Sequence, residues 1–240
     1  MTPMARFTTP ETLPEGEAKV EAVRTMFDAI APRYDLVNRI MTFRMDVRWR
    51  RSTVNSLRLP PRATVVDLAC GTGDLCRELS AAELSPIGVD LSFGMLAAAR
   101  TDAPLVHGDA LRLPLPDASV DGVTCGFALR NFESLPPFFT ELARVVRPGG
   151  RVALLEVAEP PNRFLRWGHG VYFGKVVPIV GGLLSDPAAY RYLPRSVAYL
   201  PEPGEMLDQL RVAGFTAVDR TLLSLGIAQL VTAHREMAGP

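Results

Sequence analysis

The segment that decides the fold is residues 65–75, VVDLACGTGDL. A run of β-branched and apolar residues leads into a glycine-rich turn, and a helical pattern follows, so the segment predicts a strand, a tight loop and a helix. Gly71 and Gly73 allow the backbone to turn sharply and to approach a ligand closely, because neither carries a Cβ. Units of this kind open α/β domains that bind nucleotides beyond the carboxyl ends of their strands.

The same alternation of short apolar runs and helical stretches continues after this segment. It predicts an α/β fold with a doubly wound, mostly parallel sheet. We expect strands near 63–68, 86–90, 104–107, 119–125 and 151–157, and helices near 74–82, 93–100 and 135–146. A helix near 203–213 and strands near 216–223 and 226–234 complete the chain. The last two strands are joined too closely for a crossover helix, which makes them antiparallel.

The 240 residues fit one α/β domain with added segments. One helix is expected to run from Lys19 to near Pro32, and a second helical stretch from Asp35 to Leu57. About 40 residues rich in Pro, Gly and Tyr interrupt the alternation before the last helix, and they predict a lid or an acceptor-binding insertion. The expected divisions are a disordered tail (1–18), N-terminal helices (19–60), a cofactor-binding core (63–159), the lid (160–201) and a C-terminal helix with a strand pair (202–235).

Two carboxylates bracket the glycine loop, Asp67 before it and Asp74 after it. The fingerprint for dinucleotides needs a third glycine, and Cys76 stands at that position. Carboxylates repel a pyrophosphate but attract the ammonium and sulfonium groups of S-adenosylmethionine. The loop therefore favours S-adenosylmethionine over a nicotinamide dinucleotide as the cofactor.

Further acids follow the next two strands. Asp90 ends the second strand, where a carboxylate can accept hydrogen bonds from both ribose hydroxyls, a spacing that also fits a nicotinamide dinucleotide. Asp109 follows the third strand, where it can accept from the adenine amino group. Each acid can instead cap the next helix. Acids at three successive strand ends nevertheless predict one cofactor site at this edge of the sheet.

The charge of the chain is balanced, with 26 Lys and Arg against 26 Asp and Glu, so nothing predicts a nucleic-acid partner. Two segments, 33–62 and 163–195, are locally rich in arginine. They are either solvated helix faces or contacts with an anionic membrane surface.

The three cysteines lack metal or redox spacing, so neither a zinc site nor a disulfide framework is expected, and no metal is predicted. Reduced thiols and the absence of a signal-peptide pattern predict a cytoplasmic location. The most apolar run, 171–184, is broken by Lys175 and Pro178 and is too short to span a bilayer.

Several segments carry a resemblance to a known family. The successive motifs of class I methyltransferases are resembled by four segments: VVDLACGTGDL, GVDLSFGML, HGDALRLPLPDASVDGVTCGFALRNF and ELARVVRPGGRVALLEV. Their sequences are most similar to those of the UbiE/MenG family of menaquinone and ubiquinone C-methyltransferases. Tyr34–Asn38 with Arg48-Trp49 is similar to that family's N-terminal signature, and Tyr190–Ser196 to its lid motif. The resemblance covers about Lys19 to Arg235.

This resemblance implies a set of positions that bind the methyl donor, S-adenosylmethionine. The matching residues are Thr72, Asp90, Asp109 and Ala110. Gly126 stands where the family usually has serine, so one side-chain hydroxyl contact to the donor is missing. Many members have histidine where Asp46 stands, which leaves the role of that position open.

The resemblance also implies the reaction, methylation of a ring carbon beside a hydroxyl on a prenylated quinol, most simply demethylmenaquinol to menaquinol. Loss of the phenolic proton moves electron density to the ortho carbon, which then attacks the donor's methyl group. The candidates that could serve this chemistry are, in order, Arg130, then Asn131 and Tyr192, and last His169. Each has a structural alternative, such as pairing of Arg130 with a carboxylate at the sheet end.

Three other functions stay open. The chain could methylate a soluble small molecule, could be a nicotinamide-dependent oxidoreductase, or could be a non-catalytic donor-binding partner in a quinone-synthesis complex. The lid motif opposes the first, Asp74 and Cys76 the second, and the Arg130-Asn131 pair the third. A homodimer is compatible with the sequence, which does not set the oligomeric state.

Overall fold

The glycine loop lies between strand β1 (Thr64–Leu68) and helix α4 (Asp74–Ala81), in a computed structural model that describes residues 14–237. Gly71 and Gly73 have φ angles of +57° and +84°, in the left-handed region that favours glycine. A Cβ at Gly73 would lie 2.6 Å from Cγ2 of Thr101, so this position has no room for a side chain. The expected strand, loop and helix are confirmed.

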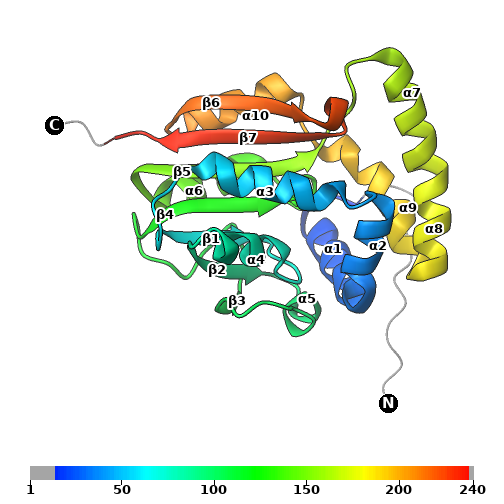
Figure 1. Cartoon of the computed structure of the whole chain (residues 1–240), viewed down its shortest axis with the longest axis horizontal. Coiled ribbons are helices and arrows are strands. Elements are labelled where there is room, and N and C mark those ends of the chain that lie inside the picture. Colours follow the sequence, from blue (N-terminus) through cyan, green and yellow to red (C-terminus); the bar gives the residue numbers. More distant parts are fainter. Residues whose placement is uncertain (1–13, 238–240) are drawn as a thin grey trace.

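Seven strands of the described chain form one sheet in the order β3-β2-β1-β4-β5-β7-β6 (Figure 1). Besides β1 they are β2 (Ser85–Asp90), β3 (Leu105–His107), β4 (Val120–Gly126), β5 (Val146–Val157), β6 (Phe215–Leu223) and β7 (Ala228–Arg235). Strands β1 to β5 pair in parallel, and β7 is antiparallel to both β5 and β6. The strand order reverses between β1 and β4, which is where open α/β sheets bind ligands.

Helices cover both faces of this sheet because its strands are buried on both sides. Val65 packs with α3 (Met45–Leu57) and α4, whereas Val66 faces the opposite side, toward α6 (Leu135–Val145) and α10 (Pro203–Val212). The short helix α5 (Phe93–Ala97) follows β2. The doubly wound, mostly parallel fold that the sequence predicts is confirmed.

The N-terminal helices differ in detail from the expectation. Helix α1 spans Gly16–Ile30, so it begins before Lys19, and residues 1–13 of the predicted disordered tail lie outside the described residues. The predicted helical stretch Asp35–Leu57 is two helices, α2 (Tyr34–Met41) and α3. Phe43 and Arg44 separate them with φ angles of 50° and 62°, a left-handed conformation that ends a right-handed helix.

The segment predicted as a lid is mainly helical. It contains α7 (Arg163–Val171), a π-helical turn (Tyr172–Val176), α8 (Val177–Leu184) and α9 (Pro187–Ser196). Pro178 and Pro187 lie in the first turns of α8 and α9, a position that tolerates proline, whereas Pro194 lies inside α9. A Cβ on Gly181 would lie 2.2 Å from Cγ of Tyr190, so Gly181 allows α8 and α9 to pack closely.

Helices α8 and α9 lie against α1 and α2 at the side of the sheet where the parallel strands end (Figure 1). One cluster of buried side chains joins the four helices: Met26, Ile30, Val37, Val177, Ala188, Ala189, Tyr190 and Tyr192. Helices α8 and α9 of the insertion and the N-terminal helices therefore form one layer over the carboxyl ends of the strands. None of the helices within residues 14–237 has the length and apolar character needed to cross a membrane.

Candidate active site

A cavity of about 520 Å³ lies at the carboxyl ends of β1, β2 and β4, under helix α1. We call it the donor cavity. Six residues singled out from the sequence line it: Gly71, Asp90, Asp109, Ala110, Gly126 and Asn131. A Cβ on Gly126 would approach Cδ1 of Leu75 to 2.9 Å, so a serine at this position would require Leu75 to move.

The carboxylate of Asp90 links the glycine loop to the end of β2. Its Oδ2 accepts from the backbone N–H of Gly71 at 2.7 Å, and its Oδ1 accepts from that of Ser92 at 2.8 Å. Burial raises the pKa of Asp90, although both N–H bonds oppose that shift. Each oxygen keeps a lone pair that can accept from a ligand hydroxyl in the cavity. Asp109 is exposed by comparison, and its Oδ1 accepts from Leu111 N at 2.9 Å.

Helix α1 is fixed over the donor cavity by its own acid, Asp28. The Oδ1 atom of Asp28 accepts from the hydroxyl of Ser92 at 2.5 Å and from Gly94 N at 2.9 Å. These bonds connect α1 to the start of α5. Helix α1 thereby brings acids to the cavity that the sequence analysis did not include.

The donor cavity is lined by five carboxylates and one arginine: Glu17, Glu21, Asp90, Asp109, Glu133 and Arg24. Arg24 forms an ion pair with Glu21 at 2.8 Å, so the remaining acids dominate the charge of the cavity. An acidic cavity suits a cationic ligand. Sequence periodicity could not identify Glu17 and Glu133, because they come to the cavity from a helix and a loop far from the glycine motif.

Asp67 is placed differently from the expectation that its charge faces the ligand. It is buried below the loop, where its Oδ1 accepts from the Thr124 hydroxyl at 2.7 Å and Oδ2 from Cys76 Sγ at 3.6 Å. Desolvation raises the pKa of Asp67 to about 7 despite these hydrogen bonds. Asp67 is not among the residues that line the donor cavity within the described chain.

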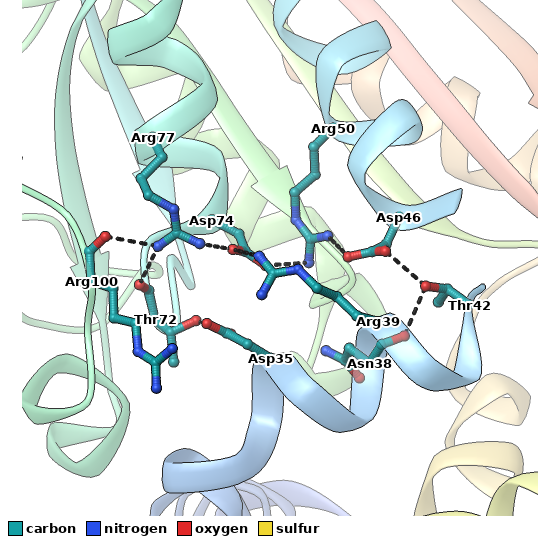
Figure 2. Close-up of polar contacts among 10 residues, drawn as sticks. All are labelled: Asp35, Asn38, Arg39, Thr42, Asp46, Arg50, Thr72, Asp74, Arg77 and Arg100. Carbon is teal, nitrogen blue, oxygen red and sulfur yellow. Dashed lines mark hydrogen bonds and ion pairs between the residues drawn. The ribbon is translucent and has the colours of Figure 1, made fainter. Parts of the chain in front are cut away.

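Asp74 also does not face the donor cavity. Figure 2 shows its carboxylate between the guanidiniums of Arg39, Arg50 and Arg77. Arg39 Nη2 lies 3.1 Å from Oδ1, and Arg50 Nη2 lies 3.3 Å from Oδ2. The sequence argument has Asp74 attract the donor's cation, whereas in the structure this carboxylate forms ion pairs with three arginines.

Thr72 connects the glycine loop to the N-terminal helices. Its hydroxyl donates to Asp35 Oδ1 in α2 (Figure 2). Thr72 and Gly73 are absent from the lining of the donor cavity, as described for residues 14–237. The loop that carries Gly71 is thus fixed on the side away from the donor cavity, through Asp35 of α2 and, by way of Asp74, through Arg50 of α3.

A second cavity, of about 400 Å³, lies between α2, α3, α7 and the end of the sheet. We call it the apolar cavity, because aromatic and aliphatic side chains form most of its wall: Met41, Phe43, Met45, Trp49, Phe127, Phe164, Leu165, Tyr172, Phe173, Val177, Leu193, Leu225 and Ile227. The few ionisable side chains in this wall include Arg50, Arg130 and His169. Such a cavity suits a large apolar ligand with one polar end.

The two cavities share Tyr34 and Phe127 as lining residues. Phe127 has a φ angle of 60°, which is unusual for a bulky residue, and its N–H donates to Leu155 O at 2.7 Å. Backbone strain of this kind is concentrated at functional sites. Burial raises the pKa of Tyr34, while the charges of Arg50 and Arg130 act in the opposite direction. The junction of the cavities is therefore aromatic, with two cations nearby.

Arg130 lines the apolar cavity but is already paired. Its guanidinium forms a buried ion pair with Glu156 of β5, and Nε donates to Ser196 Oγ of α9 at 3.2 Å. The structural alternative for Arg130, pairing with a carboxylate at the sheet end, is thus present. A charged residue inside the apolar strand VALLEV was the sequence signal for Glu156, and the sequence analysis missed it.

The other three catalytic candidates occupy different places. His169 lines the apolar cavity with a buried Nε2, Asn131 lines the donor cavity with a buried Oδ1, and Tyr192 is buried outside both cavity linings. The Nε2 atom of His169, the Oδ1 atom of Asn131 and the hydroxyl of Tyr192 have no hydrogen-bond partner among residues 14–237. Desolvation lowers the pKa of His169, which favours the neutral imidazole.

No group of three or more His, Cys, Asp or Glu in the described part of the chain is arranged to hold a metal ion. The three cysteines are free thiols and are buried.

The model of the ubiE/COQ5 methyltransferase family matches residues 15–235. The chain belongs to this family. The resemblance that the sequence motifs carry is thereby confirmed, and with it the prediction of a methyltransferase.

Similar curated proteins cover nearly the whole chain. A demethylmenaquinone methyltransferase of Roseiflexus castenholzii is 42% identical, with 92% of this chain and 96% of the relative aligned. A ubiquinone/menaquinone biosynthesis C-methyltransferase UbiE of Syntrophotalea carbinolica is 39% identical, with 90% of this chain and 95% of the relative aligned. Family membership therefore extends through the N-terminal helices and the insertion.

Solved structures agree on the fold. A putative methyltransferase from Haloferax volcanii, in complex with its Trm112 activator, superposes with a TM-score of 0.64 at 18% identity, covering 88% of this chain and 97% of that one. At this identity the likeness concerns the fold alone.

Proposed function

We propose that the protein transfers a methyl group from S-adenosylmethionine to a ring carbon of a prenylated quinol, most simply demethylmenaquinol to menaquinol. The observation that carries the proposal is the meeting of an acidic donor cavity and an apolar cavity at Tyr34 and Phe127. Relatives at about 40% identity named for this reaction support it.

The residues of the donor cavity fit S-adenosylmethionine. Asp90 offers a free lone pair on each carboxylate oxygen, which suits two ribose hydroxyls. The unpartnered Oδ1 of Asn131 is a ready acceptor for an ammonium or amino group. Asp109 and Ala110, at the end of β3, are our candidates for the adenine edge. Glu17 and Glu133 supply the negative charge that the sequence analysis had attributed to Asp67 and Asp74.

When bound, S-adenosylmethionine supplies an electrophilic methyl group. The protein must deprotonate the acceptor and orient its ring carbon toward this methyl group. Removal of the phenolic proton makes the neighbouring ring carbon nucleophilic. The new carbon–methyl bond forms as the sulfur–methyl bond breaks, and loss of the ring proton with return of a proton to oxygen restores the aromatic ring. Positioning and the exclusion of water can supply much of the rate.

Three residues are candidates for these roles in the apolar cavity. Arg130 is held by Glu156 and Ser196, so it can stabilise a phenolate oxygen from a fixed position. His169 has an unpartnered nitrogen and a lowered pKa, so its neutral imidazole can take a proton. Tyr34 stands between acceptor and donor. Tyr192, outside the lining, supports the fold of the insertion near Arg130.

The exposed side of the insertion supports contact with a membrane. Helices α7 and α8 expose large apolar side chains, with Phe164 85%, Trp167 75%, Ile179 63% and Leu183 82% accessible. Arg163, Arg166 and Lys175 are exposed on the same segment. Apolar side chains with neighbouring cations suit the surface of an anionic bilayer. We therefore propose peripheral binding at the cytoplasmic face, where a prenyl chain can pass from lipid into the apolar cavity.

The decisive experiment is methyl transfer with purified protein, S-adenosylmethionine and a short-chain prenyl quinol kept reduced. A product heavier by one methylene unit, with the methyl on the ring carbon, is the expected result. Methylation of unprenylated phenols alone would favour a soluble acceptor. Donor binding without transfer to any acceptor would favour the non-catalytic partner. The homodimer remains a prediction that sedimentation can test.

A further inference from the structure

Arg50 is a buried cation in the wall of the apolar cavity. It projects from α3, and its side chain is 8% exposed. Nη1 lies 2.5 Å from Asp46 Oδ2 and Nη2 lies 3.3 Å from Asp74 Oδ2 (Figure 2). Burial alone disfavours its charge, but Asp74 and Asp46 raise the pKa of Arg50 above its ordinary value. The guanidinium is therefore a permanent charge at this wall.

Asp74 has two cationic partners besides Arg50. Arg39 and Arg77 both pair with the other carboxylate oxygen, Oδ1. Three guanidiniums thus surround two carboxylates, those of Asp74 and Asp46, and the cluster carries an excess of positive charge. Among these arginines, Arg50 lines the apolar cavity within the described chain, and Arg39 and Arg77 do not. A role for Arg50 in pairing with carboxylates does not require its guanidinium to line the apolar cavity.

Arg50 also has hydrogen-bond donors to spare. A guanidinium has five N–H donors, and its two carboxylate contacts engage one terminal nitrogen each. Its Cζ lies 5.6 Å from the centre of the Phe127 ring, so the guanidinium is near the junction of the two cavities. The pKa of Tyr34 responds to both Arg50 and Arg130, which places two cations around one aromatic hydroxyl at this junction.

We propose that Arg50 positions the acceptor by donating hydrogen bonds to a second ring oxygen, while Arg130 serves the oxygen beside the methylated carbon. This inference rests on the proposed function. It makes the enzyme selective for aromatic rings with two oxygens, because two guanidiniums fixed by separate carboxylates hold such a ring in one orientation. A ring with one hydroxyl leaves Arg50 without a ligand.

The test compares two acceptors that differ by one oxygen. The first is 2-geranyl-1,4-naphthalenediol, and the second is 3-geranyl-1-naphthol, which keeps only the hydroxyl beside the carbon to be methylated. Wild type, Arg50→Gln and Arg50→Lys are assayed for KM and kcat with both. Quenching of Trp49 fluorescence, measured in a Trp167→Phe background, reports binding without turnover.

Loss of a hydrogen bond from a charged donor is expected to weaken binding of the diol about 10- to 100-fold in Arg50→Gln. Binding of the naphthol should change by less than about threefold, because its ring lacks the oxygen concerned. Arg50→Lys keeps a positive charge but loses the planar fork, so it should fall between wild type and Arg50→Gln for the diol alone.

Arg39→Gln is the matched control, because it also removes a partner of Asp74 but does not line the apolar cavity. It should leave the preference for the diol unchanged. Equal losses with both acceptors in the Arg50 variants, or the same loss in Arg39→Gln, would overturn the inference and make Arg50 a structural residue. If wild type methylates neither geranyl acceptor, the proposed function itself fails.

Discussion

The guanidinium of Arg130 and the carboxylate of Glu156 form an ion pair in which the two side chains are 7% and 0% exposed. The pair connects the loop after β4 to the interior of β5, and Ser196 extends the connection to α9. A buried pair of this kind constrains how a catalytic role of Arg130 can be tested, because removing one partner leaves the other charge uncompensated.

Arg130→Ala should therefore lower the free energy of unfolding by about 3–5 kcal/mol, and its loss of activity is not by itself evidence of catalysis. Arg130→Lys keeps the charge and is the informative variant. It should lower kcat about tenfold or more while the affinity for S-adenosylmethionine stays near wild type, because Arg130 lines the apolar cavity and not the donor cavity. Steady-state kinetics and calorimetry measure both quantities. A parallel loss of donor affinity in Arg130→Lys would place this residue in the donor site.

Asp90→Ala should weaken binding of S-adenosylmethionine. The change removes the two oxygens that can accept from the ribose hydroxyls, at a cost of about 1–3 kcal/mol in binding free energy. The N–H groups of Gly71 and Ser92 also lose their partner, which lowers the stability of the protein. Asp109→Ala should cost less, because Asp109 is exposed and solvent can replace it. Titration calorimetry compares the two. If Asp109→Ala were the more damaging change, the assignment of the ribose to Asp90 would be wrong.

The raised pKa of Asp67 predicts that the free energy of unfolding depends on pH differently in wild type and in Asp67→Asn. Its pKa of about 7 in the folded protein exceeds the usual value of about 3.9, so the folded state holds a proton that the unfolded state releases between these values. The stabilisation is complete below about pH 4 and is lost as the pH rises through 7. Asp67→Asn lacks this titration but can still accept from Thr124.

Urea unfolding of wild type and Asp67→Asn at pH 5 and pH 8 measures the effect. Wild type should lose more free energy of unfolding between these pH values than the variant does, since titrations elsewhere in the chain are common to both. Parallel pH dependence in the two proteins would show that Asp67 is already ionised at pH 5.

The sheet and the donor cavity were largely predictable because the relevant signals are local. Strand ends and positive-φ glycines can be identified from a few adjacent residues, and parallel strands bring such ends to one edge. This is why Gly71, Asp90 and Asp109 were found together, whereas Ala110 and Gly126 came from the family resemblance. The turn at residues 43–44, which divides the predicted second helix, carries neither glycine nor proline and therefore gave no signal.

The roles of the charged side chains were much harder to predict. Asp74 is adjacent to the loop in sequence, but its partners Arg39 and Arg50 come from helices that precede the sheet. Glu156 lies in β5 and pairs with Arg130, which follows the neighbouring strand β4. Pairings between residues far apart in the chain depend on how the elements pack, and sequence position alone did not reveal the arginine partners of Asp74.

The exposed apolar residues of α7 and α8 lead to a final prediction, on membrane binding. Trp167 and Leu183 are 75% and 82% exposed, and neither lines the apolar cavity, so both can be changed without altering the acceptor site. Burying one side chain of this size is worth about 1.5–3 kcal/mol, so Trp167→Ser with Leu183→Ser should weaken binding to anionic vesicles about tenfold or more. The electrostatic share, about 1 kcal/mol for each nearby cation, should fade as salt is added.

Co-sedimentation with phosphatidylglycerol vesicles at low and high ionic strength measures both contributions. The control is Val212→Ser, which removes an apolar side chain that is 89% exposed on α10, away from α7 in Figure 1. This variant should sediment like wild type. All three proteins should methylate a geranyl acceptor in detergent at similar rates, because the two cavities are intact. If the double variant still sediments as wild type does, or if wild type does not bind vesicles at all, α7 and α8 are not a membrane-binding surface, and the methyltransferase must receive its acceptor from solution.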